Sequence, residues 1–333
     1  MITFLIRRTL LGGLTLVVIS VVAFVIIQLP PVDYAEVYIS EWHAFNPGAT
    51  METLDAMRNS IRAQLGLDSP LYVQYAIFAR NMLTGDFGES YEHNRPIIEV
   101  LGDRILLTVI LAMSTVMFTW VMALPIGIYS AVRQRSLGDY TFTFLGFIGL
   151  AVPDFMLALL MMYFAFVWFD ADIGGLFSRE YINAAWGSGK AWDLSKHLVI
   201  PCIILGTSGT AGLIRILRAN LLDELRRPYV MTARAKGLQE LRVVLKYPVR
   251  VALNPMISTV GYTLPFLISG SVIVSVVLNL HTIGPVFLRA IQAQDMILAA
   301  TIVMMLSLLT VVGTLISDIL LVIVDPRIRL QGQ

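Results

Sequence analysis

The sequence predicts an all-α integral membrane protein with six transmembrane helices and a sizeable extracytoplasmic loop after the first of them. Two observations carry this prediction. Hydrophobic residues make up 57% of the 333 residues and charged residues only 14%, whereas soluble domains average roughly 25% charged residues. Six stretches are also long and apolar enough to cross a bilayer, which takes about 20 residues of helix. A soluble globular domain is therefore excluded.

Each apolar stretch is predicted to be helical, because an unpaired backbone polar group cannot face lipid. The six stretches cover residues 9–29, 105–131, 140–169, 197–217, 257–278 and 298–324. The first stretch resembles a signal peptide, because the basic pair Arg7-Arg8 precedes its apolar run. Pro30-Pro31 follows it in place of a small-residue cleavage site, so we interpret it as a retained signal anchor.

The fourth stretch is interrupted by small and hydroxyl residues from Gly206 to Gly212. Small residues in a membrane helix let a neighbouring backbone approach closely. This run therefore predicts either a helix–helix contact or the lining of a path. The glycines expected in helix packing are Gly206, Gly209 and Gly212, and those expected at close contacts or along the path in the fifth stretch are Gly261 and Gly270.

The basic residues near the ends of the stretches set the predicted orientation. With six spans the following residues fall on one side of the membrane: Arg7, Arg8, Arg133, Arg135, Arg218, Arg226, Arg227, Arg234, Lys236, Arg242, Lys246, Arg250, Arg327 and Arg329. The positive side is normally the cytoplasm. We therefore expect both termini in the cytoplasm, and the loops after the first, third and fifth stretches outside it.

The first outer loop, residues 31–103, is long enough to hold structure of its own. Leu54, Met57, Ile61 and Leu65 recur at helical spacing over residues 52–65. Thr50 or Thr53 precedes or opens this helix as its cap. It is expected to pack on the outer membrane-facing surface or to take part in binding. In the second outer loop, residues 170–196, Trp186 and Trp192 suit an interfacial aromatic belt.

Several kinds of site are missing from the sequence. No phosphate-binding glycine loop occurs, so no ATPase site is expected. No nucleophile signature points to catalysis. The histidines His43, His93, His197 and His281 lack metal-ligand spacing, and Cys202 is the single cysteine, so no metal site and no internal disulfide are predicted. No basic tail or aromatic-basic patch suggests nucleic-acid binding.

Two acidic residues stand inside predicted membrane helices, where ionisable groups often mark function. Asp154 follows Pro153 near the middle of the third stretch. Proline bends a helix, so Asp154 has either a structural or gating role at the bend or a place along the path. Asp318 lies in the sixth stretch and is interpreted as a helix-packing or end-anchoring residue.

The loop between the fourth and fifth stretches is the most informative segment. Residues 228–235 are predicted to form a short helix that Gly237 ends, since glycine adopts the left-handed conformation at low cost. A second helix over residues 238–247 places Leu238, Leu241, Val244 and Leu245 on one stripe. Such a helix–glycine–helix segment either seats in a groove of another protein or lies on anionic lipid.

The segment Thr232-Ala-Arg-Ala-Lys-Gly237 resembles the loop of the binding-protein-dependent transport permeases, in the branch that serves oligopeptides, dipeptides and nickel. Further resemblances follow in order along the chain at residues 65–75, 85–90, 95–96 and 325–329. Together they cover nearly the whole chain. Each motif alone is moderately specific, and the ordered set is strongly so.

The resemblance implies the transmembrane fold of a type I ABC importer, in the inner membrane of a bacterium or archaeon. It implies a transporter permease subunit and not an enzyme. Its cargo would be oligopeptides or dipeptides, or alternatively oligosaccharides or nickel. The implied partners are a second homologous permease chain in a heterodimer, two ATP-binding subunits that use ATP and magnesium, a periplasmic or lipid-anchored substrate-binding protein, and membrane lipid.

The resemblance also assigns roles to residues. The short helix becomes the coupling helix that docks on an ATPase, and Gly237 becomes its turn. The implied docking residues are Tyr229, Thr232, Ala233, Arg234, Ala235, Lys236, Gly237 and Glu240. The small residues would keep the helix slim, and Arg234 and Lys236 would meet acidic groups on the ATPase.

The resulting organisation is an N-terminal transmembrane helix (residues 1–30), the outer loop (31–103), a permease domain (104–325) with its coupling loop at 218–256, and a C-terminal tail (326–333). The chain departs from the family pattern at Met231, where relatives carry a glutamate, and at Tyr247-Pro248, which favours a short second helix. A stand-alone secondary carrier is the competing function, and the scarcity of buried acids disfavours it.

Overall fold

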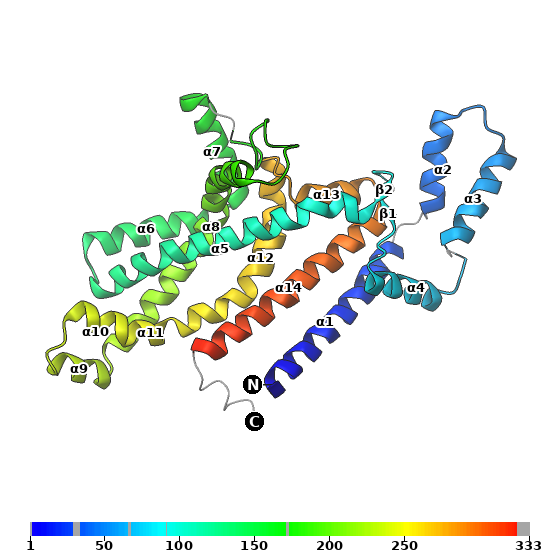
Figure 1. Ribbon diagram of the computed structural model, residues 1–333. Coiled ribbons are helices and arrows are strands. Elements are labelled where there is room, and N and C mark those ends of the chain that lie inside the picture. Colours follow the sequence, from blue (N-terminus) through cyan, green and yellow to red (C-terminus); the bar gives the residue numbers. More distant parts are fainter. Residues whose placement is uncertain (1, 29–33, 66–67, 91, 171–172, 325–333) are drawn as a thin grey trace. The chain divides into compact units, whose positions relative to one another are not determined.

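The computed structural model of the chain describes residues 2–28, 34–65, 68–90, 92–170 and 173–324. Helices make up nearly all of the regular structure in these ranges (Figure 1). Two short strands, β1 (Glu89–Ser90) and β2 (Arg95–Pro96), pair as an antiparallel hairpin. The all-α prediction is confirmed. The predicted C-terminal tail and the Pro30-Pro31 pair lie outside the described residues.

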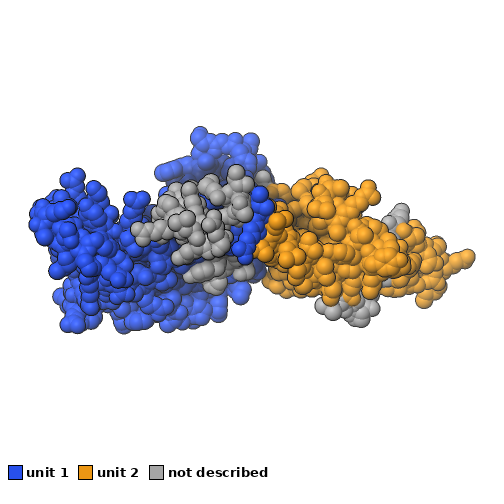
Figure 2. All heavy atoms as spheres, turned by 90° about the horizontal axis from the view of Figure 1, so that it is seen from below, with its two compact units in different colours: residues 1–8, 105–285, 309–333 blue, residues 9–104, 286–308 orange. Residues whose placement is uncertain are grey.

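The chain forms two compact units (Figure 2). The first contains residues 1–8, 105–285 and 309–333, and the second contains residues 9–104 and 286–308. The chain passes from the second unit to the first within α5 (Ile97–Val132). Gly102 has a non-helical backbone there, so the helix is kinked just before the boundary.

Several of the helices have the length and apolar character of membrane spans. Within the described residues four helices qualify: residues 6–28 of α1 (Ile2–Gln28), α5, α8 (Ser188–Leu225) and residues 296–319 of α14 (Met296–Val324). A fifth is obtained when α6 (Leu137–Ala151) and α7 (Asp154–Phe169) are counted as one broken span. The predicted fifth stretch is helical as α12 (Asn254–Val277). The chain is a multi-pass membrane protein.

The stretch over residues 140–169 changes direction at Pro153 as predicted, but it forms two separate helices and not one bent helix. The axes of α6 and α7 differ by 103°. Val152 is extended, with φ −87° and ψ 121°, and Pro153 follows with ψ 138°. The proline ring disfavours the helical conformation of the residue before it, and proline offers no backbone N–H to the preceding turn. The polypeptide chain therefore changes direction here, and Asp154 begins a new helix.

The fourth predicted helix is longer than its apolar stretch. The structure starts α8 at Ser188, so the last part of the predicted outer loop is helical. The added turns are anchored by Lys190, whose ammonium group donates to the carbonyl oxygen of Ala184 at 2.7 Å and lies 4.9 Å from the centre of the Phe177 ring. An apolar window could not find these polar turns, because their contacts come from the preceding loop.

In the first unit α8 packs against α5 and α6. Glycines make the contacts close. A methyl group placed on Gly127 of α5 would lie 2.9 Å from Leu217 of α8, and one placed on Gly149 of α6 would lie 2.7 Å from Thr207. Such distances are too short for a real Cβ atom, so a larger residue at either position would force its neighbour to shift.

A buried ion pair joins α8 to the start of α6. Arg218 donates from Nε and from its terminal nitrogen to the two carboxylate oxygens of Asp139, both at 2.9 Å. The Asp139 side chain is 2% exposed, and it also accepts from the backbone N–H of Arg135. Ser136 caps α6 by accepting from the Asp139 backbone N–H. The short connection between α5 and α6 is therefore fixed to α8.

In the second unit α1 packs against α4 (Leu71–Thr84). The hydroxyl groups of Ser20 and Tyr75 are hydrogen-bonded at 2.9 Å, and the rings of Phe24 and Tyr75 meet edge to face. The helix α4 follows Pro70 and ends at Gly85, which has a left-handed backbone. The sequence reasoning did not find α4, because its apolar residues lack a clear stripe.

The predicted helix of the first outer loop is confirmed as α3 (Met51–Leu65). The Thr50 hydroxyl accepts from the Thr53 backbone N–H at 3.5 Å, so Thr50 is the cap. The helix packs on α2 (Tyr34–Phe45), which sequence reasoning missed. Arg58 of α3 pairs with Glu36 of α2 at 2.7 Å, so the contact combines charge with the buried Leu54.

Breaking the Arg218–Asp139 pair is expected to destabilise the fold. Arg218→Met leaves the Asp139 carboxylate buried and unpaired, which typically costs about 3 kcal/mol or more. We expect the melting temperature of the detergent-solubilised chain to fall by about 5 °C or more.

Arg226→Met is the matched control, since Arg226 is an exposed arginine just beyond the end of α8. The double variant Asp139→Leu with Arg218→Met is expected to recover stability, because it removes both charges. An Arg218→Met variant that melts with the wild type would contradict a structural role for the pair.

Candidate functional site

The segment after α8 contains three short helices: α9 (Pro228–Ala235), α10 (Glu240–Lys246) and α11 (Pro248–Ala252). We call α9, α10 and the turn between them the helical hairpin, residues 228–246. The prediction of a helix over residues 228–235 is confirmed. Arg227 is extended and Pro228 takes the first helical position, where its missing N–H would be unpaired in any case.

Gly237 turns the chain between the two helices. Its φ of +76° lies in the left-handed region, which glycine reaches without a steric cost. The Gly237 N–H donates to the carbonyl oxygen of Arg234 at 2.9 Å, and the Lys236 N–H donates to that of Thr232 at 3.1 Å. In the described chain no atom lies within 4 Å of the position that a Cβ on Gly237 would occupy. The glycine is therefore required by backbone conformation and not by space.

The second helix is shorter than predicted at both ends, and its buried face is different. Tyr247 departs from the helix before Pro248, which begins α11. The predicted apolar stripe is wrong in part, because Leu241 is 64% exposed and Leu245 is 49% exposed. The fully buried residue is Val243, which the stripe had omitted. The helix α10 packs on α9 through Val243 and on the long helices through Val244, so a single apolar stripe did not describe it.

The hairpin has a small apolar core of its own. Val230 and Ala233 of α9 pack on Val243 of α10, and all three are buried. Leu238 and Tyr247 close this core at its edges. Ala233, one of the implied docking residues, therefore faces inward. Its small size lets α9 lie close to α10.

An ion pair closes the hairpin across the Gly237 turn. Arg234 Nε lies 3.0 Å from Glu240 Oε2, and a terminal guanidinium nitrogen lies 2.6 Å from Oε1. The hydrogen bond from Arg234 holds the pKa of Glu240 below its ordinary value, and the same bond raises the pKa of Arg234. Both residues were implied docking residues, yet within this chain they pair with each other.

Glu224, at the end of α8, holds the first turn of α9. The Tyr229 hydroxyl donates to the Glu224 carboxylate, and Arg227 pairs with the same carboxylate at 3.6 Å. Burial and this carboxylate raise the pKa of Tyr229 to about 12. Sequence reasoning missed Glu224. In the sequence Glu224 is only an acidic residue five positions before Tyr229. The two residues belong to different helices, so helical spacing could not predict their contact.

A second and larger apolar cluster joins this segment to the long helices. Val244 of α10 and Val249 of α11 pack with Leu217 and Leu221 of α8 and with Met256 of α12. Ala123 and Ala131 of α5 belong to the same cluster. The hairpin is thus continuous, through packed side chains, with three helices of the first unit.

The surface that the hairpin presents is mixed in character. Exposed residues of the hairpin include the apolar or small Tyr229, Met231, Thr232, Ala235, Leu241 and Leu245, and the charged or polar Arg234, Lys236, Gln239, Glu240, Arg242 and Lys246. Exposed apolar side chains gathered on one small element are a common mark of a protein-binding surface. A short, internally bonded hairpin with such a face can seat in a groove of another protein.

The structure brings together two groups of residues that the sequence had singled out separately. The Asp154 carboxylate lies within hydrogen-bond reach of the Ser208 hydroxyl in the small-residue run of α8. A methyl group placed on Gly206 would lie 2.6 Å from the Phe118 ring of α5, and one on Gly209 would lie 3.5 Å from Thr119. Of the two interpretations left open for this run, its glycines at 206 and 209 fit the helix–helix contact. No described atom lies within 4 Å of such a methyl group on Gly212, which lacks the expected close contact.

Asp318 pairs with Arg8 at 3.2 Å, which joins the start of α1 to the end of α14. Gly261 and Gly270 both lie in α12, and the surroundings of Gly261 lie outside the described part of the structure. Among the described residues no group of three or more His, Cys, Asp or Glu side chains is placed to hold a metal ion.

Comparison with known proteins identifies the family. The model of the binding-protein-dependent transport system inner membrane component matches residues 123–330, and the model of the N-terminal part of such membrane components matches residues 1–112. The chain belongs to this family. It is therefore a permease subunit of a transport system, located in the inner membrane.

Similar proteins match over their whole length. The oligopeptide transport system permease protein AppB of Bacillus subtilis is 35% identical, and the match covers 99% of this chain and 100% of the relative. The dipeptide transport system permease protein DppB of Lactococcus lactis is 31% identical over 99% and 100%. The glutathione transport system permease protein GsiC of Salmonella choleraesuis is 30% identical over 99% of each chain.

We expect the Arg234–Glu240 pair to make the hairpin of this permease more rigid. Glu240→Gln removes the charge and keeps the shape. Exposed ion pairs contribute about 0.2–1 kcal/mol, so we expect amide hydrogen exchange in residues 228–246 to quicken by up to about fivefold at pH 7. Exchange in the long helices is expected to stay unchanged.

The pH dependence follows from the lowered pKa of Glu240. The stabilisation is complete above the ordinary glutamate value of about 4.3 and is lost as pH falls through the lowered value. The difference between wild type and Glu240→Gln should therefore vanish in strong acid. Arg242→Gln removes a charge from the same helix without touching the pair, and equal quickening in that control would contradict the assignment.

Proposed function

We propose that this permease forms half of the translocation path of an ATP-driven importer of peptides. The support comes from three relatives whose names specify oligopeptide, dipeptide and glutathione transport, each matching at 30% identity or more over 99% of this chain. Among the cargoes considered, peptides are favoured over oligosaccharides and nickel for this reason. A free-standing carrier is disfavoured because the family works with a binding protein.

The proposed architecture is the type I importer fold with six spans: α1, α5, the broken pair α6 and α7, α8, α12 and α14. It keeps the predicted division into residues 1–30, 31–103, 104–325 and 326–333. Both termini and the hairpin lie in the cytoplasm, in agreement with the clustering of Lys and Arg in the loops of that side. Residues 31–103 lie outside the cytoplasm.

The proposed partners are a second homologous permease, two ATP-binding subunits that use ATP and magnesium, and a substrate-binding protein. The hairpin is the site at which an ATP-binding subunit docks. Its exposed surface supplies the contact, and it includes Tyr229, Thr232, Ala235 and Lys236. Arg234 and Glu240 hold the shape of the hairpin, and Gly237 supplies its turn.

Docking at the hairpin provides a route for motion. When the ATP-binding subunits close, they displace α9 and α10 as one body, because the core around Val243 and the Arg234–Glu240 pair resist bending. The cluster of Val244, Leu217 and Met256 then transmits the displacement to α8 and α12. Packed interfaces of this kind switch between discrete arrangements more readily than they deform.

The path itself is proposed to involve the bend between α6 and α7. Pro153 supplies the break, and Asp154 reaches Ser208 of α8 from the first turn of α7. A rearrangement of this bend would alter the contact between α7 and α8. Gly261 and Gly270 of α12 are proposed to let neighbouring chains or cargo approach this helix closely.

Substitution of Gly237 tests the docking assignment. Valine resists a positive φ, at a cost of roughly 1–3 kcal/mol, so Gly237→Val should alter the turn and separate the exposed faces of α9 and α10. We expect peptide uptake by the complete transporter in cells to fall by about tenfold or more, with membrane insertion unchanged. Uptake of a radiolabelled peptide is the measurement.

Gly237→Asn is the matched control, because asparagine tolerates the left-handed conformation. Both variants add a side chain at a position with open space, so only the backbone preference distinguishes them. Uptake should largely survive in Gly237→Asn. Full uptake by Gly237→Val would remove the hairpin from the coupling mechanism.

A further inference from the structure

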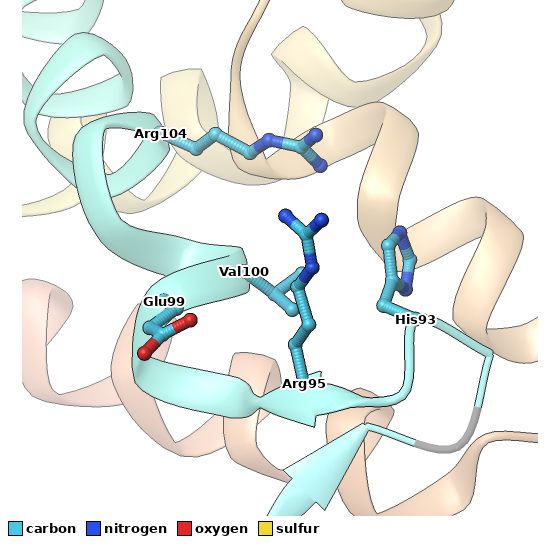
Figure 3. Close-up of a pocket in the computed structure, with 5 residues that line it drawn as sticks. All are labelled: His93, Arg95, Glu99, Val100 and Arg104. Carbon is cyan, nitrogen blue, oxygen red and sulfur yellow. The ribbon is translucent and has the colours of Figure 1, made fainter.

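A basic pocket lies in the second unit, where the β1–β2 hairpin meets the start of α5 (Figure 3). Its volume is about 450 Å³ and its lining residues are His93, Arg95, Glu99, Val100 and Arg104. The Arg95 side chain points toward the guanidinium end of Arg104, which extends across above it, and the His93 ring lies beside the Arg95 side chain (Figure 3). Glu99 lies on the opposite side from His93.

The pocket is built on a buried anchor. Asp295, just before α14, is 1% exposed and accepts a hydrogen bond from the Ser90 hydroxyl at 2.7 Å and one from the Glu92 backbone N–H at 3.3 Å. Its other oxygen accepts from the Leu298 backbone N–H at 3.1 Å. The Ser90 hydroxyl also lies 3.2 Å from His93 Nδ1. These hydrogen bonds therefore fix the position of the segment that carries His93 and Arg95.

Charges of both signs surround the pocket. Arg104 is repelled by Arg289 of α13 (Ile283–Gln292) and attracted by Glu92. Its guanidinium is half-buried and also faces that of Arg95. The arginine fork matches the two oxygens of a carboxylate and binds them in parallel.

We propose that this pocket binds the terminal carboxylate of a cargo peptide on the outer side of the membrane. The proposal rests on the proposed function, which supplies the cargo and the orientation of residues 31–103. Arg95 and Arg104 take the carboxylate between them, and His93 adds a hydrogen bond. Glu99, across the pocket, is placed for a cationic group on the same peptide.

Size and position support this occupant. A cavity of about 450 Å³ falls in the range of about 300–1,000 Å³ that small-molecule sites show. It suits the end of a peptide better than a folded domain. In the chain, the residues that line the pocket directly precede the apolar part of α5.

Arginine modification tests the binding directly. The permease is purified within the complex it forms in its native membrane, treated with phenylglyoxal, and analysed by mass spectrometry at Arg95 and Arg104. Trialanine should slow the modification of both residues, whereas trialanine amide, which lacks the carboxylate, should not. Arg80, an exposed arginine of α4, should be modified at the same rate under all conditions.

Transport by variants tests the consequence. Arg95→Gln should raise the half-saturating concentration of a peptide with a free carboxylate by about tenfold, the loss of one charge-assisted contact, and should leave the maximal rate unchanged. Arg80→Gln is the matched control. The preference of the wild type for free peptides over their amides should shrink in Arg95→Gln and persist in Arg80→Gln.

Three results would overturn the proposal. Equal protection by trialanine and its amide would exclude carboxylate binding. Protection by vesicles of an anionic phospholipid, without protection by trialanine, would assign the pocket to lipid headgroups. Unchanged kinetics in Arg95→Gln would show that transport does not use the pocket, with peptide uptake itself intact. Absence of peptide uptake in the wild-type complex would instead contradict the proposed function.

Discussion

The attachment of the helical hairpin to α8 is the contact on which the functional interpretation depends. Val244 and Val249 pack against Leu217 and Leu221, and the same cluster reaches α5 and α12. A hairpin tethered only by flexible chain would move without moving the membrane helices. Because these side chains are buried together, a force on α9 is carried into α8. The close approach of Leu217 to Gly127 extends that continuity into α5.

The hairpin has its own apolar core and its own ion pair. Its core is closed by Val230 and Val243, and Arg234 pairs with Glu240 across the turn. What remains exposed is a mixture of apolar, small and charged residues. The Arg234–Glu240 pair braces the two helices against each other within this chain.

Local patterns predicted the parts of the structure that depend on local physics. The helix over residues 228–235, the turn at Gly237 and the helix capped by Thr50 follow from proline, glycine and threonine at their usual positions. Membrane helices followed from length and apolar character, although Val152-Pro153 redirected one stretch by 103°.

The contacts between distant residues could not be predicted in this way. The Arg218–Asp139 pair and the Asp295 anchor join residues 79 and 205 positions apart. Arg234–Glu240 crosses a turn whose shape had to be known first. Likewise, burial of Val243 in place of Leu241 depends on which side of α10 meets α9. Periodicity shows that a helix has a buried side, but its neighbour decides which residues lie on it.

Site-specific photo-crosslinking from Ala235 tests the central claim most directly. A benzophenone amino acid at this exposed position of α9 should join the permease to an ATP-binding subunit in native membranes. The same group at Trp192, exposed at the other end of α8, should not. Crosslinks from Ala235 to lipid alone would contradict the account, because the hairpin would then rest on the membrane surface and not on a partner.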